Sequence, residues 1–169
     1  MLRSRLRLLF SVALFVALVS PLVACKRDAA PSEDQLDALA RVAAASTLVV
    51  RGTPTGEREL FLQGSPRTIS TIAVTDVLKG EARTSLKLRQ VGTERDTASV
   101  PDSEPLVSSD DSYWLFLKQS SDGETFDVSG RALYRVAGRH AVLVTNARTL
   151  PKRIPAAELT AVVRRAETP

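Results

Sequence analysis

The feature that most constrains the fold of this chain is its single cysteine, Cys25. No disulfide can form within the chain, so its fold has to be stabilised by burial of apolar side chains. The residues from Cys25 onward are numerous enough for one domain with a core of its own. Aromatic residues are few, and three of them, Tyr113, Trp114 and Phe116, lie close together. We predict that this segment is the centre of the core.

The residues before Cys25 have the three parts of a secretory signal. Arginines stand near the start, residues 8–19 are almost wholly apolar, and a small residue, Ala24, precedes the expected cleavage site. The alternative is a transmembrane anchor, but the apolar stretch is shorter than the ~20 residues that span a bilayer. We therefore predict a cleaved signal peptide over residues 1–24.

The tetrad Leu22-Val23-Ala24-Cys25 resembles the lipobox of bacterial lipoproteins. The resemblance implies cleavage between Ala24 and Cys25 and attachment of lipid to the Cys25 thiol, with residues 25–31 as a lipidated tether. Each buried methylene contributes ~0.8 kcal/mol, so two or three acyl chains form a stable anchor. The next residue is Lys26, whereas inner-membrane retention signals have an aspartate there. We therefore predict that the protein is exported and anchored to a membrane, and that in a cell with two membranes the outer membrane is favoured.

Residues 32–169 predict a single β-rich domain with a helix at each end. Ser32 and Gln35 have the spacing of a capping box, which predicts a helix over residues 33–45. Pro155 suits the first turn of a final helix, in which apolar residues recur at helical spacing from Leu159 to Ala166.

Between the helices the sequence has the apolar alternation and turn residues of short strands. The apolar phase slips between Val74 and Val77, which indicates a β-bulge. Asp122-Gly123 is typical of a hairpin turn. We predict a mainly β fold, either a small barrel or a strongly curved antiparallel sheet. The predicted strands are 47–51 (ended by Gly52), 57–63, 68–78, 86–89, 113–117, 125–128, 132–136 and 141–145.

Two segments, 71–80 and 111–117, resemble uncharacterised bacterial exported proteins with the pattern V-x-x-V-L-K-G … G-x-x-Y-L-L-F-L. More distantly, residues 48–144 resemble netrin-like domains and tissue inhibitors of metalloproteinases, which implies an OB-like barrel. Those inhibitors have disulfides and bind the zinc of their target through a free N-terminal cysteine amine. With one cysteine, and that one lipidated, this chain cannot use that mechanism.

Candidate site residues are few. The long polar loop over residues 92–111 is a candidate contact surface, with Asp110 and Asp111 as possible binding residues. The alternative for these carboxylates is a polar turn before the next strand. His140 is the only histidine, so a metal site with two histidines is excluded, and we predict no metal and no cofactor.

These features predict a lipid-anchored cell-envelope protein that acts as a non-catalytic binding module for an envelope protein or glycan. An inhibitor of an envelope or extracellular hydrolase is the alternative. A small hydrolase that uses Asp110 or Asp111 with His140 is a third hypothesis, although no catalytic constellation is found. Apart from the N-terminal arginines, the 23 basic and 19 acidic residues nearly balance. Near neutrality and export both argue against nucleic acid as a partner.

Overall fold

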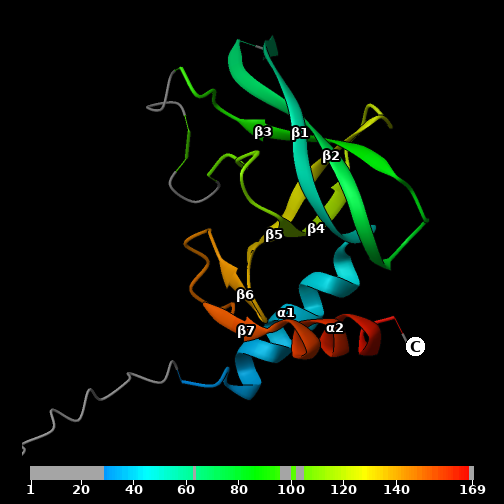
Figure 1. Cartoon of the computed structure of the whole chain (residues 1–169), viewed down its shortest axis with the longest axis vertical. Helices are drawn as coiled ribbons and strands as arrows, with labels where there is room; N and C mark the ends of the chain where they lie inside the picture. Colours follow the sequence, from blue (N-terminus) through cyan, green and yellow to red (C-terminus); the bar gives the residue numbers. More distant parts are fainter. Residues whose placement is uncertain (1–28, 63, 96–99, 102–104, 168–169) are drawn as a thin grey trace, which may run out of the picture.

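The computed structural model of the chain describes residues 29–62, 64–95, 100–101 and 105–167. Ala24, Cys25 and most of the predicted tether lie outside these residues. Within them the chain forms seven strands in one sheet and two helices (Figure 1). The elements are α1 (Glu33–Ala45), β1 (Leu48–Leu62), β2 (Ser65–Lys79), β3 (Ser85–Val91), β4 (Tyr113–Gln119), β5 (Thr125–Ala137), β6 (His140–Leu143), β7 (Arg153–Pro155) and α2 (Ala156–Arg165).

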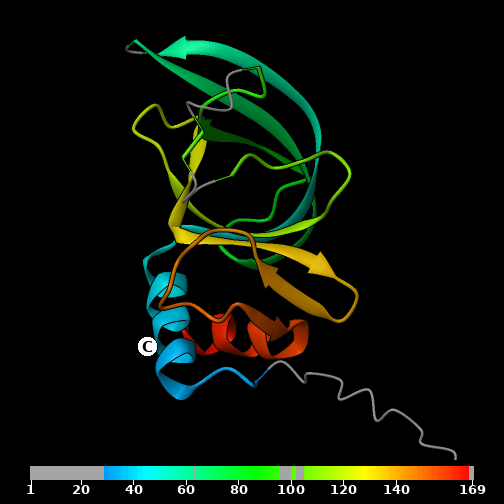
Figure 2. The same cartoon turned by 90° about the vertical axis from the view of Figure 1, so that its left-hand side faces the viewer.

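The sheet closes on itself. Its strand order is β3-β2-β1-β4-β5-β6-β7 with antiparallel neighbours, and an additional parallel pairing joins β3 to β5. The strands β1 to β5 thus form a partial ring, and Figure 2 shows this ring above the two helices. A partly open ring of five strands is consistent with an OB-like barrel. The predicted mainly β fold with a helix at each end is confirmed.

The prediction that Gly52 ends a strand is wrong. The predicted strands 47–51 and 57–63 are parts of one long strand, β1, which contains Gly52. A Cβ atom at Gly52 would lie 2.5 Å from Ile72 Cγ2 and 2.7 Å from the Ala73 carbonyl oxygen. The glycine therefore allows β1 and β2 to approach closely where their pairing is irregular, and it does not mark a turn.

The predicted β-bulge is confirmed. In β2 the residue paired after Val74 is Asp76, which leaves Thr75 as an extra residue. Two further predicted strands, 125–128 and 132–136, are joined in the single strand β5. β7 was not predicted from the sequence, because three residues are too few to show a period.

β5 bends at Gly130, where φ is +56°. A Cβ atom there would lie 2.8 Å from Val42 Cγ2 of α1, so the glycine allows both the left-handed backbone and the close approach of the helix. The pairing of β5 with β4 shifts next to this bend, between Leu115 and Leu117. The sequence signals for two strands thus correspond to two halves of one bent strand.

The described side chains form two hydrophobic clusters, one on each face of β4. Trp114 and Phe116 belong to a cluster with α1, α2 and β7. Tyr113, Leu115 and Leu117 belong to the cluster inside the barrel. All five residues are buried, and β4 is the central strand of the order, which confirms the predicted centre of the core.

Helix α1 has the predicted bounds and the predicted capping box between Ser32 and Gln35. Its last turn has no basic residue of its own. Lys79, at the end of β2, supplies the charge instead and donates through Nζ to the carbonyl oxygens of Ala43 and Ala44, each at 2.8 Å. Neither helix in the described part of the chain has the length and apolar character needed to cross a bilayer.

Candidate functional site

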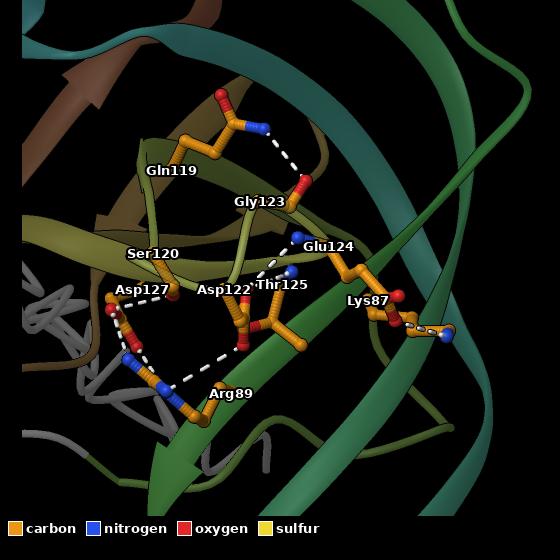
Figure 3. A network of polar contacts seen from close by, with 9 residues as sticks. All are labelled: Lys87, Arg89, Gln119, Ser120, Asp122, Gly123, Glu124, Thr125 and Asp127. Carbon is orange, nitrogen blue, oxygen red and sulfur yellow. Dashed lines mark hydrogen bonds and ion pairs between the residues drawn. The ribbon is translucent and has the colours of Figure 1, made fainter.

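The ring closes through a short junction between β3 and β5. Only two residue pairs join these parallel strands, Lys87 with Thr125 and Leu88 with Phe126. Beyond Leu88 the connection is made by side chains. The Arg89 guanidinium donates to both carboxylate oxygens of Asp127, from Nε to Oδ1 at 2.9 Å and from Nη2 to Oδ2 at 2.8 Å (Figure 3). This two-point contact fixes the orientation of both side chains.

The turn between β4 and β5 adds a second carboxylate to this contact. Asp122 Oδ1 accepts hydrogen bonds from the backbone N–H groups of Glu124 and Thr125, each at 2.9 Å, and Oδ2 accepts from the Thr125 hydroxyl at 2.6 Å. Such bonds from an aspartate to the backbone two or three residues on are typical of tight turns. Asp122 Oδ2 also lies 3.8 Å from Arg89 Nη1. The turn therefore brings its carboxylate to β3.

The contacts within this network shift the pKa values of Arg89 and Asp122. The hydrogen bond to Asp127 is the main cause of a raised pKa of Arg89. Hydrogen bonds from the Thr125 side chain and then from the backbone lower the pKa of Asp122 to about 2. Asp122 is therefore ionised at neutral pH and is unsuited to donate a proton as a general acid.

A cleft of about 550 Å³ lies beside this network. Its walls come from the β1–β2 hairpin, the start of β2, the end of β3, the β4–β5 turn and β5. We call it the junction cleft; it is lined by Leu62, Arg67, Arg89, Gln90, Val91, Ser121, Asp122, Asp127 and Val128.

Arg67 differs from the other arginines with buried nitrogens. Arg51, Arg67 and Arg83 each have a buried side-chain nitrogen without a hydrogen-bond partner. Arg51 pairs with Asp76 and lies over the Trp114 ring, and Arg83 similarly has both an ion pair and a ring contact. Arg67 has neither an acidic partner nor a ring within the part of the chain that the structure describes.

The tip of the β1–β2 hairpin borders the junction cleft and is apolar. Phe61 is 75% exposed and Leu62 is 39% exposed, and they are the large hydrophobic side chains that the described residues leave in solvent. Figure 1 shows this tip at the end of the molecule opposite α1, α2 and the start of the described chain. An exposed phenylalanine at a protruding tip is typical of a contact surface.

The structure does not bring the sequence-predicted residues together. Asp111 pairs with Arg135 of β5 at 3.6 Å. Asp110 is exposed in a turn, where its backbone N–H donates to Ser108 Oγ at 3.3 Å. His140 lies in β6, and its Nδ1 is 3.3 Å from Arg153 Nη2. The two aspartates thus lie in a polar turn before β4, as in the alternative reading of these residues.

Part of the loop over residues 92–111 is attached to the barrel. Val107 is buried, and its N–H donates to Gln90 Oε1 at 3.1 Å. Gln90 Nε2 donates to the Pro105 carbonyl oxygen at 2.9 Å. This stretch therefore serves as packing.

The residues of the junction cleft were missed from the sequence. Arg67, Arg89 and Asp127 fall within or beside predicted strands, where outward charges are ordinary. The available signal was Asp122-Gly123, which was identified as a turn only. Among the described residues, no group of three or more histidine, cysteine, aspartate or glutamate side chains is placed to hold a metal ion.

No protein-family model matches the chain, and no curated protein sequence matches it.

Proposed function

We propose that this chain is an exported, lipid-anchored protein of the bacterial cell envelope whose barrel binds a protein partner at the junction cleft and the adjoining hairpin tip. The observation that carries the proposal is the position of this surface. The tip of the β1–β2 hairpin, which carries Phe61 and Leu62 and borders the cleft, lies at the opposite end of the molecule from the helices and the start of the described chain. A lipid on Cys25 would thus hold the helical end near the bilayer and present the cleft to the surroundings.

The length of the tether supports this orientation. An extended chain spans at most ~3.6 Å per residue, so the six steps from Cys25 to Pro31 reach roughly 20 Å. That length keeps α1 close to the headgroups, with the hairpin tip at the opposite end of the molecule. The apolar tip is therefore available to a partner rather than to the bilayer.

The chemistry of the surface favours a polypeptide over a glycan. Exposed aromatic side chains at a protein surface are the usual anchors of protein interfaces. After Leu88 in β3 and Phe126 in β5, these two strands no longer pair with each other through their backbones. An extended peptide can form backbone hydrogen bonds with such unpaired strand edges. No aromatic ring lines the cleft itself to stack on a sugar.

The anchor is tested with Cys25→Ser in the full chain. We expect the wild-type protein to take up radiolabelled palmitate and to sediment with membranes, and the variant to do neither. Sedimentation of the variant at the wild-type level would contradict the lipid anchor and would favour a transmembrane segment.

The binding surface is tested with a photoreactive phenylalanine analogue at Phe61 in membranes. The matched control places the same analogue at Ala161, an exposed residue of α2. We expect a discrete crosslinked protein at position 61 only, which is lost when Leu62→Glu is added. Equal crosslinking from both positions, or crosslinking to glycan alone, would contradict the proposed surface.

The protruding hairpin also supports a second candidate function. A narrow tip with an exposed phenylalanine can enter the cleft of an enzyme, as an inhibitor of an envelope or extracellular hydrolase would. If the protein crosslinked through position 61 is a hydrolase, addition of the purified chain should lower its turnover, and Phe61→Ala should restore it. Unchanged turnover would leave the binding module as the function.

A further inference from the structure

The junction cleft contains one charged side chain, Arg67, that makes no ion pair with another described residue. The cleft is lined by two arginines and two aspartates, and both aspartates contact Arg89. Arg67 has no such contact, and its Nη1 is buried without an acceptor. A buried guanidinium nitrogen that has given up water without gaining a hydrogen bond is costly. A ligand that brings an anionic oxygen to this atom removes that cost.

The backbone of Arg67 is held on both sides. Arg67 pairs with Leu60 of β1 and with Val91 of β3, so it lies between two hydrogen-bonded strands. Little conformational freedom of the backbone remains to be lost when a ligand arrives, which favours binding at this position.

We infer that Arg67 binds a carboxylate group of the partner, next to an apolar side chain that lies against Leu62, Val91 and Val128. This inference rests on the proposed function and identifies what the cleft recognises. Asp122 and Asp127 repel any anion in the cleft, and they repel a phosphate dianion more strongly than a carboxylate monoanion. The apolar part of the lining suits the body of a branched aliphatic residue.

The test follows the side-chain Nε–Hε resonances of the arginines in the full chain, ¹⁵N-labelled and solubilised in detergent. The probes are isobutyrate, isobutyramide and inorganic phosphate. We expect isobutyrate to shift the Arg67 signal saturably, at a concentration about tenfold lower than it shifts Arg58, an exposed arginine of β1. Isobutyramide should not shift Arg67. Equal shifts at both arginines, an equal effect of the amide, or tighter binding of phosphate would each overturn the inference.

Two variants separate this inference from the proposed function. Arg67→Gln should lower crosslinking of the partner through position 61 about tenfold or more, as expected for the loss of a charge-assisted hydrogen bond. Arg58→Gln removes the same charge from the neighbouring strand and should leave crosslinking unchanged. Full crosslinking by Arg67→Gln would overturn the carboxylate contact and leave the binding module standing. Absence of crosslinking in the wild type would instead refute the binding module.

When a partner has been crosslinked, amidation of its C-terminus identifies the source of the carboxylate. Loss of crosslinking on amidation assigns the contact to the C-terminal carboxylate. Retention, with loss on substitution of an acidic side chain, assigns it to that side chain. Retention after both changes would overturn the inference.

Discussion

Tyr134 should destabilise the fold through its hydroxyl group. The residue has no exposed surface, and among the described residues its Oη has no hydrogen-bond partner. Its ring packs against Phe116 with the centroids 6.1 Å apart. Tyr134→Phe keeps this ring contact and removes only the buried oxygen.

The expected gain follows from the cost of burying an unpaired hydroxyl, which is about 1–3 kcal/mol in proteins. The small void that the oxygen leaves removes part of this gain. We therefore expect Tyr134→Phe to raise the free energy of unfolding by about 1 kcal/mol, and the melting temperature by roughly 4 °C.

The stability advantage of Tyr134→Phe over the wild type should increase at alkaline pH. Burial raises the pKa of the Tyr134 hydroxyl, so the unfolded wild type binds fewer protons than the folded protein above pH ~10. Wild-type stability then falls by up to ~1.4 kcal/mol per pH unit from this group. Tyr134→Phe has no such group, and its advantage should widen from pH ~10 upward.

The assay is urea unfolding followed by the fluorescence of Trp114, the only tryptophan and a buried one. The matched control is Tyr113→Phe, because the Tyr113 oxygen accepts from the Ser108 N–H at 2.9 Å. The control should lose about 1 kcal/mol. If Tyr134→Phe loses stability as the control does, the Tyr134 hydroxyl has a partner and the reasoning is refuted.

Three further predictions concern the ring. Gly52→Ala should cost about 1–3 kcal/mol in urea unfolding through overpacking, whereas Gly56→Ala, in open space on the same strand, should cost much less; equal costs would contradict the close approach of β1 and β2. Hydrogen bonds lower the pKa of Asp122 to about 2. The stability that Asp122 contributes should therefore be complete above its unfolded pKa near 4 and be lost as the pH falls toward 2. Asp122→Asn should flatten the plot of stability against pH in this range, and parallel plots for wild type and variant would contradict the prediction. Asp127→Asn should lose the two-point contact with Arg89, and hydrogen exchange at the Leu88 amide should become faster. An unchanged exchange rate at Leu88 would contradict the view that the junction is the weak point of the ring.

The sequence predicted those features that local chemistry determines. The capping box of Ser32 and Gln35 depends on two side chains three residues apart, and the structure confirms it. The bulge at Thr75 was visible as a slip in the apolar period. The burial of residues 113–117 followed from a run that is apolar on both faces.

The rest depended on contacts between distant segments. Gly52 was interpreted as a strand end because its tight contact with Ile72 comes from another strand. Arg89 and Asp127 are 38 positions apart, and their pairing depends on the closure of the ring. No local pattern distinguishes Arg67, because an arginine without an ion pair is recognised only when the contacts of its neighbours are known.

The two faces of β4 have a consequence for how the molecule unfolds. Trp114 and Phe116 belong to the helical cluster, while Leu115 and Leu117 belong to the barrel cluster. Opening either cluster exposes one side of the same strand and weakens the other cluster with it. The helices and the barrel should therefore melt in one cooperative transition, with the amides of β4 the last to exchange with solvent.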